Sequence, residues 1–274
     1  MQARATVVVD VGDVPVALST GDPALAAVLQ RRFHRFLTST SASSSATGAP
    51  AFHFDISVIP DDGEEGDRDE DLQVRAEGGL WRLRRGDFRA EWDPETRRGW
   101  IHQRLSPYAA DSVLRIVHTL LLSRARGFLL HASSVVRNGR AFLFTGPSGA
   151  GKTTIARLAP SDAAVLTDEI SYVRRVGDRY MAYGTPFAGE LSDSGEPISA
   201  PVAAVFGLAW ASDPSHERLA EGAAVQMLMR NILFFAADPA LIGDLLDTAC
   251  DFAAAVPAFR LAFAPDARVW STIQ

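Results

Sequence analysis

The chain has 274 residues, of which 47% are hydrophobic and 22% are charged, and its formal net charge at pH 7 is −6. These values are typical of a globular protein with one large domain or two small ones, and they exclude a disordered chain, a collagen and a coiled-coil rod. The negative charge disfavours unselective binding to nucleic acid, and no apolar stretch reaches the roughly 18 residues of a membrane-spanning helix, so neither nucleic acid nor a membrane is an expected partner.

Residues 1–105 are predicted to form a smaller, accessory α+β domain. Asp22 can cap a helix and Pro23 can begin it, so residues 23–36 predict a helix. Short apolar runs predict strands, the later ones in a β-meander, at 5–9, 14–18, 52–59, 72–75, 80–84, 88–92 and 99–102. Residues 38–50 are rich in Ser, Ala and Thr, and 61–71 hold eight acids, so both predict solvated loops.

Residues 106–274 are predicted to form a second, larger domain, which opens with a helix at 107–125. Asn138–Gly139 between two apolar runs, 128–137 and 141–145, predicts a hairpin with a type I′ turn. Further helices are predicted at 152–158, 223–235 and 239–254, and further strands at 163–166, 170–174, 180–183, 202–209 and 259–263. Residues 184–201 are rich in Gly, Ser and Pro. With a single cysteine, Cys250, and no secretory signal at its start, the chain is expected in the cytoplasm.

A phosphate-binding pattern, GxxxxGK[ST], follows the predicted strand 141–145. Its residues are Gly146, Pro147, Ser148, Gly149, Ala150, Gly151, Lys152 and Thr153, with Thr154 next. Glycines let backbone N–H groups surround phosphate oxygens, the lysine can lie between the β- and γ-phosphates, and the threonine hydroxyl can bind Mg²⁺. The competing interpretation is a strand-to-helix turn without a ligand. It is less favoured because Lys152 is the only lysine among 27 basic residues.

Two acidic residues, Asp168 and Glu169, follow the next predicted strand along the chain. One carboxylate can hold Mg²⁺ while the other takes the proton from an attacking hydroxyl. The alternative interpretation gives neither residue a role in chemistry: Asp168 would cap a helix or loop, and Glu169 would be exposed to solvent. His131 ends the strand that leads into the hairpin, next to the phosphate-binding strand. A lone histidine in such a place either has a structural role or reaches the end of the sheet where phosphate would bind.

These motifs resemble the HPr kinase/phosphorylase family and its relatives. The resemblance rests on HASSVV, the Asn-Gly hairpin, GPSGAGKTT and the closely following TDE. Later runs, YGTPFAGE, SAPVAAVFGL and ERLAEGAAVQMLMRNILFF, are similar to a short subfamily of HPr-kinase-like serine kinases. Some of those are associated with modification of ribosomally made peptides, including lasso-peptide precursors. Over about residues 127–273, the resemblance implies an α/β P-loop kinase core of the HPr kinase/phosphoenolpyruvate carboxykinase type that uses ATP and Mg²⁺.

The resemblance also implies roles for single residues. It makes Asp168 the general base and turns Glu169 toward the metal, whereas a generic strand-end interpretation exchanges these roles, and both assignments stay open. His131 corresponds to the family histidine near the transferred phosphate. Glu190, Arg218 and Arg230 lie in subfamily-like segments, where they are candidates for contact with phosphate, metal or acceptor. For the two arginines a surface ion pair is an equal alternative.

The sequence therefore predicts a kinase that transfers the γ-phosphate of ATP to a serine hydroxyl on a protein or peptide. The glutamate–arginine–glycine signature of HPr kinases proper has no counterpart here, which argues against HPr as substrate and against phosphorolysis. One alternative is a small-molecule hydroxyl kinase, and another is a nucleotide-binding regulatory protein with little turnover. The acceptor, the choice among ATP, GTP and pyrophosphate, and the oligomeric state stay open, with a homo-oligomer among the alternatives.

Overall fold

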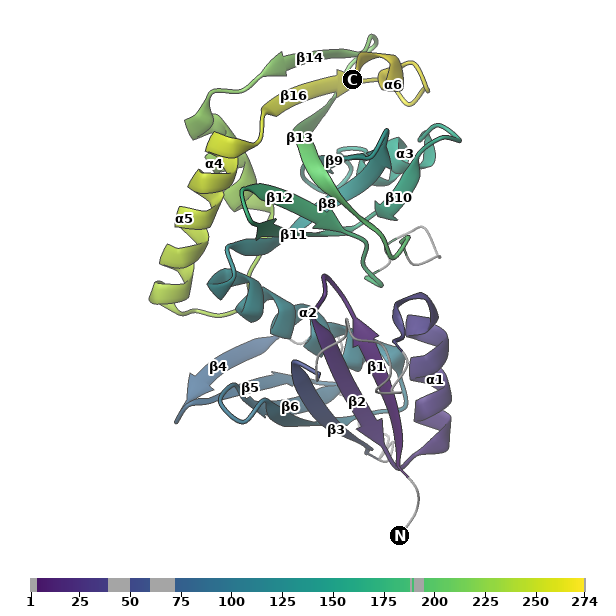
Figure 1. The fold of residues 1–274 in the computed structure, drawn as a ribbon, viewed down its shortest axis with the longest axis vertical. Helices are drawn as coiled ribbons and strands as arrows, with labels where there is room; N and C mark the ends of the chain where they lie inside the picture. Colours follow the sequence, from purple (N-terminus) through teal and green to yellow (C-terminus); the bar gives the residue numbers. More distant parts are fainter. Residues whose placement is uncertain (1–3, 39–49, 60–71, 188, 190–194, 274) are drawn as a thin grey trace. The chain divides into compact units, whose positions relative to one another are not determined.

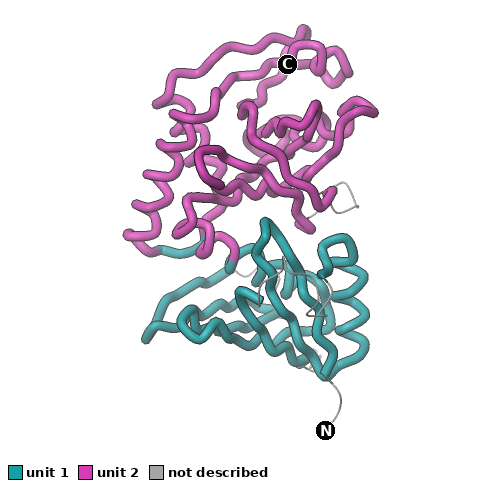
Figure 2. Tube along the Cα trace, viewed as in Figure 1, with its two compact units in different colours: residues 1–117, 235–237 teal, residues 118–234, 238–274 magenta. Residues whose placement is uncertain are grey.

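A computed structural model describes residues 4–38, 50–59, 72–187, 189 and 195–273. The predicted loops at 38–50 and 61–71 fall almost entirely outside this part of the chain. Figure 2 shows two compact units, residues 1–117 with 235–237 (unit 1) and residues 118–234 with 238–274 (unit 2). Their boundary lies inside helix α2 (Pro107–Arg124), downstream of residue 105, where the sequence predicts a domain boundary.

Unit 1 contains a seven-stranded sheet in the order β1-β2-β3-β7-β6-β5-β4 (Figure 1). Its strands are β1 (Ala5–Asp10), β2 (Pro15–Thr20), β3 (Phe52–Val58), β4 (Gln73–Glu77), β5 (Leu80–Arg85), β6 (Phe88–Asp93) and β7 (Arg98–Gln103). The pairs β2–β3 and β3–β7 are parallel and the others antiparallel. Strands β4 to β7 form the predicted meander. Buried hydrophobic and exposed polar residues alternate along β5 and β6, so one face of the meander belongs to the core.

Helix α1 (Pro23–Phe33) packs on β1 and β2 and begins as its sequence predicts. The Asp22 carboxylate accepts hydrogen bonds from the backbone N–H groups of Ala24 and Leu25, at 2.8 and 3.0 Å. This cap satisfies two donors that have no partner inside the helix. A short 3₁₀ turn, η1 (His34–Phe36), follows the helix.

Unit 2 contains a nine-stranded mixed sheet in the order β10-β8-β11-β12-β13-β16-β14, with β9 paired to β8 and β13, and β15 paired to β8. Strands β9, β13 and β16 run parallel to one another, and the other pairings are antiparallel. The strands are β8 (Gly127–Arg137), β9 (Arg140–Thr145), β10 (Ala164–Thr167), β11 (Ile170–Val176), β12 (Arg179–Tyr183), β13 (Ser199–Trp210), β14 (Ser215–Arg218), β15 (Ile232–Leu233) and β16 (Ala258–Phe263). The helices are α3 (Lys152–Arg157), α4 (Glu221–Asn231), α5 (Pro239–Ala255) and α6 (Val269–Thr272).

The β8–β9 hairpin confirms the turn predicted from the sequence. Asn138 and Gly139 have φ angles of 51° and 70°, the left-handed values that a type I′ turn requires at both positions. Strand β9 is buried along nearly its whole length, because the hydrophobic side chains of unit 2 cover both of its faces. The uninterrupted apolar run of β9 reflects this two-sided burial. Residues 146–151, which follow β9, are therefore attached to a strand that is buried on both faces.

The structure also corrects the predicted elements in unit 2. The helix predicted at 223–235 ends at Asn231, because Ile232 and Leu233 adopt extended backbone and pair with β8 as β15. Strand β14 and helix α6 were not predicted. All four residues of β14 are exposed, so no buried face marks it in the sequence, and it is a strand because it pairs with β16. Within the part of the chain that the structure describes, no helix is both long and apolar enough to cross a membrane.

Candidate active site

The segment between β9 and α3, here called the glycine loop (residues 146–151), has the backbone that its glycines allow. Gly146, Gly149 and Gly151 have φ angles of 155°, 77° and 102°. Such values are readily adopted only by residues without a Cβ atom. At Gly151 space is short as well, because a Cβ atom would lie 2.7 Å from Cζ of Phe263. The loop leads directly into the N-terminus of α3, where unpaired N–H groups and the helix dipole favour an anion.

Two aromatic residues support the glycine loop from the ends of β13 and β16. The indole Nε1 of Trp210 donates a hydrogen bond to the carbonyl oxygen of Gly149 at 2.9 Å. The Trp210 ring stacks on Phe263 with ring centroids 4.9 Å apart. Sequence reasoning did not identify either residue. The signal that could have found them is an aromatic residue at the carboxyl end of each of two strands that run parallel to β9.

The ammonium group of Lys152 lies inside the loop. Its Nζ donates hydrogen bonds to the carbonyl oxygens of Gly146 and Pro147, at 2.9 and 3.1 Å. Only 8% of the residue is exposed. Burial lowers the pKa of Lys152, and the nearby carboxylate of Glu169 partly opposes that shift. The positive charge is therefore held at the loop and close to one of the two predicted acids.

The acidic residues lie directly after β10, at the turn into β11. Asp168 is buried, and its Oδ1 accepts a hydrogen bond from the backbone N–H of Gly189 at 3.0 Å. Glu169 is half-buried, and its backbone N–H donates to the hydroxyl of Thr167 at 3.2 Å. Both acidic side chains lie beside Gly189, but the Asp168 carboxylate accepts a hydrogen bond from its N–H, whereas the Glu169 carboxylate is the one that acts on the pKa of Lys152.

His131 lies on β8, next to both halves of the site. Its carbonyl oxygen accepts a hydrogen bond from the hydroxyl of Thr145, the last residue of β9, at 2.9 Å. The backbone N–H of Ala132, the next residue, donates to the carbonyl oxygen of Glu169 at 3.0 Å. Burial, and secondarily the charge of Lys152, lowers the pKa of His131 below its ordinary value. The imidazole is therefore neutral at pH 7.

These side chains surround a single hollow of about 480 Å³. It is lined by His131, Ser148, Gly149, Gly151, Lys152, Thr153, Thr154, Asp168, Glu169 and Gly189. The structure thus brings together residues that the sequence places on three separate segments. Gly146, Pro147 and Ala150 belong to the loop without lining the hollow.

The remaining candidates lie elsewhere. Arg218 on β14 and Arg230 on α4 are exposed, and neither is among the described residues that line the hollow. Glu190 lies outside the described residues. Gly189, which the sequence did not single out, contacts Asp168 through its backbone N–H.

The oxygen atoms near the loop fit a magnesium ion that is bound jointly with a phosphate group. No group of three or more His, Cys, Asp or Glu residues gathers into a metal cage among the residues that the structure describes. Magnesium does not need such a cage, because it usually takes one or two carboxylates and completes its shell with water and substrate phosphates. Thr153, Asp168 and Glu169 could supply such oxygen ligands from the wall of the hollow.

Comparison with known proteins places this part of the chain in a family. Residues 108–274 match the family model described as SynChlorMet cassette protein ScmC. The chain belongs to the ScmC family. The match includes the whole of the hollow, so its lining residues lie in the ScmC part of the chain.

This ScmC-family chain was also compared with curated proteins and with solved structures. No curated protein matches it. Among solved structures, it is similar to the Hpr(Ser) kinase/phosphatase from Coxiella burnetii at 9% sequence identity, with a TM-score of 0.29. That match covers 49% of this chain and 84% of the other.

Proposed function

We propose that this ScmC-family chain is a phosphotransferase that moves the γ-phosphoryl group of ATP, with Mg²⁺, to a serine hydroxyl of a protein or peptide. One observation carries the proposal: the glycine loop, the only lysine of the chain, two carboxylates and a neutral histidine line one hollow. Phosphoryl transfer needs this set, since it depends on positioning and on stabilising negative charge.

In this proposal, residues 146–154 form the P-loop. The N–H groups of the loop and of the first turn of α3 bind the β- and γ-phosphates, and Lys152 exchanges its carbonyl partners for phosphate oxygens. Thr153 and one carboxylate hold Mg²⁺, which neutralises charge on the phosphates when bound. Trp210 and Phe263 stabilise the conformation of the loop, through the hydrogen bond to Gly149 and the contact with Gly151.

The surroundings of the two acids support Asp168 as the base and Glu169 as the metal ligand. The Glu169 carboxylate acts on Lys152, on the phosphate side, whereas the Asp168 carboxylate accepts a hydrogen bond from Gly189, in the Gly-, Ser- and Pro-rich segment 184–201 that in this proposal helps to shape the acceptor site. Asp168 accepts the proton of the serine hydroxyl while the serine oxygen forms a bond to the γ-phosphorus. The bond from that phosphorus to the oxygen of the departing ADP breaks in the same step. His131, which lines the same hollow and is neutral at pH 7, donates a hydrogen bond to the transferred group in this proposal.

The proposal is tested by incubating the purified protein with Mg²⁺ and γ-labelled ATP and with short peptides encoded beside its gene. We expect label on a serine of such a peptide. Lys152→Ala should lower the rate by roughly 10²–10³-fold, as expected for the loss of one donor to transition-state charge. Arg157→Ala is the matched control, because Arg157 is an exposed cation on the same helix, outside the hollow.

Two results would contradict the proposal in different ways. Label found only on a sugar or another metabolite would identify a small-molecule hydroxyl kinase. Retained ATP binding with neither transfer nor hydrolysis would identify a regulatory nucleotide-binding protein.

A further inference from the structure

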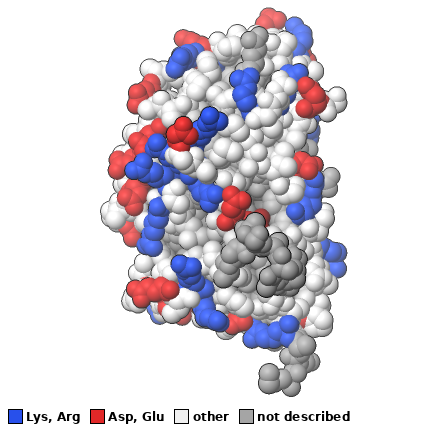
Figure 3. Space-filling view, in the orientation of Figure 1, with Lys and Arg blue, Asp and Glu red and all other residues white. Residues whose placement is uncertain are grey.

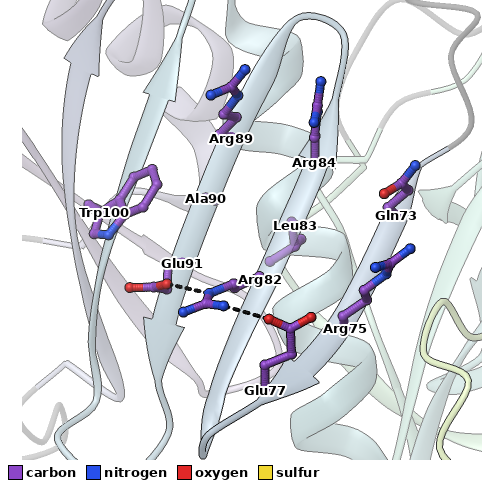
Figure 4. A pocket seen from close by; sticks show the side chains of 10 residues that line it. All are labelled: Gln73, Arg75, Glu77, Arg82, Leu83, Arg84, Arg89, Ala90, Glu91 and Trp100. Atoms are coloured by element: carbon purple, nitrogen blue, oxygen red, sulfur yellow. Dashed lines mark hydrogen bonds and ion pairs between the residues drawn. The ribbon is translucent and has the colours of Figure 1, made fainter.

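The solvent-facing side of strands β4 to β7 in unit 1 carries a group of arginines, here called the arginine face (Arg75, Arg84 and Arg89). Cross-strand pairing sets Arg84 directly opposite Arg89, and Arg75 opposite Arg82. All four side chains point away from the core, because they alternate with buried residues such as Leu83 and Ala90. Figure 4 shows Arg84 and Arg89 extending from neighbouring strands.

The acidic residues of this region are already engaged by another arginine. Arg82 forms ion pairs with Glu77 at 2.5 Å and with Glu91 at 2.7 Å, on either side of it (Figure 4). No ion pair joins Arg75, Arg84 or Arg89 to any residue within the described ranges. Like charges directly opposite each other on antiparallel strands destabilise a sheet. The Arg84–Arg89 pair therefore costs stability and has no structural compensation among the described contacts.

The same surface is hollowed and has an apolar side. A hollow of about 360 Å³ lies over these strands, and Trp100 is the apolar side chain that lines it from the solvent-facing side, since the side chains of Leu83 and Ala90 belong to the core. Trp100 is half-buried on β7, and its ring lies 4.3 Å from that of His102. The arginines can hold carboxylates of a ligand through paired hydrogen bonds, while Trp100, at the β7 side of the same hollow, can pack against an aliphatic group of that ligand.

We infer that the arginine face binds an acidic peptide segment in extended conformation. The net charge of the chain is −6, and acidic and basic residues are interspersed on the face drawn in Figure 3, so this cluster does not reflect a generally basic protein. Glu77 and Glu91 favour a peptide over nucleic acid. Both lie within the hollow, where they would repel a continuous phosphate backbone but can face the neutral residues of a peptide.

This binding does not depend on catalysis, because the arginine face and the candidate active site belong to different units. Only the role of this binding rests on the proposed function: if the chain is a peptide kinase, the arginine face would hold an acidic stretch of the acceptor peptide. Binding is therefore measured without nucleotide, so that a failed kinase assay leaves the result intact.

The experiment measures fluorescence anisotropy of a labelled peptide in which Glu and Asp alternate with Gly and Leu, titrated with the full chain. We expect saturable binding that weakens at high salt. Arg84→Thr and Arg89→Thr, which keep a strand-compatible side chain, should each weaken binding by about fivefold or more. Arg31→Gln is the matched control, since Arg31 is an exposed arginine on α1, and it should leave binding unchanged.

Three outcomes would overturn the inference. The first is equal binding of a matched peptide with Gln and Asn in place of the acids. The second is tighter binding of single-stranded RNA than of the acidic peptide. The third is binding only after the acids of residues 61–71 are changed to Ser, which would assign the face to the chain's own acidic segment. A melting temperature of both Thr variants that is equal to or above that of the wild type, as expected when one of two facing like charges is removed, shows that any loss of binding is local.

Discussion

At position 151 the backbone has a φ angle of 102° and a Cβ atom would lie 2.7 Å from Phe263 and 3.1 Å from the Trp210 ring. Gly151→Ala must therefore displace the aromatic pair or distort the loop. We expect it to abolish measurable ATP binding in isothermal titration and to lower the melting temperature. Gly149→Ala is the control, because Gly149 has a similar backbone, with φ 77°, but open space around it. Equal losses in both variants would show that only the left-handed backbone matters.

The two acids differ enough in their surroundings to be separated by amide substitutions. Asp168→Asn should lower kcat by roughly 10²–10⁴-fold and leave the affinity for Mg-ATP nearly unchanged, because it removes only the proton acceptor. Glu169→Gln should instead raise the Mg²⁺ concentration required for half-maximal rate. Steady-state kinetics over a range of Mg²⁺ concentrations distinguishes the two effects. The opposite pattern would exchange the two roles.

The residues of the candidate site were predictable where a short motif has fixed spacing. The loop and Lys152 follow from one pattern, and the two acids follow from the apolar strand before them. Gly189 could not be predicted, because it meets the site only through its long-range contact with Asp168; Trp210 has only its position at a strand end as a signal, and its partner Gly149 lies far away in the chain. No local pattern encodes a contact between residues that lie far apart in the chain.

Among elements, those with their own caps, turns or buried faces were predictable from the sequence. Helix α1 has Asp22 as its cap, and the β8–β9 hairpin has Asn138–Gly139 at its turn. Strands β14 and β15 lack such signals. One is fully exposed and the other has two residues, and both are strands only because a distant strand offers hydrogen bonds.

The cap of α1 provides a test at the scale of an element. Asp22→Ala removes the acceptor for the N–H groups of Ala24 and Leu25 and should cost about 1 kcal/mol of unfolding free energy. Asp22→Ser keeps a capping oxygen and should cost less. Urea denaturation at pH 7 measures both variants. A loss in Asp22→Ala no larger than that in Asp22→Ser would mean that packing alone holds the start of the helix.

The acid sensitivity of the whole molecule should depend on a histidine buried in α2. His118 is fully buried, its two ring nitrogens have no hydrogen-bond partner among the described residues, and burial lowers its pKa to about 4. Its ring lies against Tyr172 and Phe187, at centroid distances of 5.5 and 6.4 Å. The native state thus keeps the imidazole neutral in a pH range, below about 6.5, in which a solvent-exposed histidine is protonated.

Because the unfolded chain binds this proton more readily, stability falls as the pH drops from about 6.5 toward 4. The total loss from this group is on the order of 3 kcal/mol. His118→Leu should remove that part of the pH dependence, so its unfolding free energy should fall less between pH 7 and pH 5. Parallel slopes for the wild type and the variant in urea denaturation would contradict the assignment.

The way β8 is paired has a consequence for how the molecule folds. Its pairing with β9 closes only a two-residue turn, whereas its pairings with β10, β11 and β15 join residues progressively further along the chain. Loop-closure entropy grows with the length of the loop, so the hairpin is expected first. During synthesis this hairpin, with its bond between Thr145 and the His131 carbonyl, can form before the acids leave the ribosome. The base of the glycine loop would then be a nucleus of folding as well as part of the site.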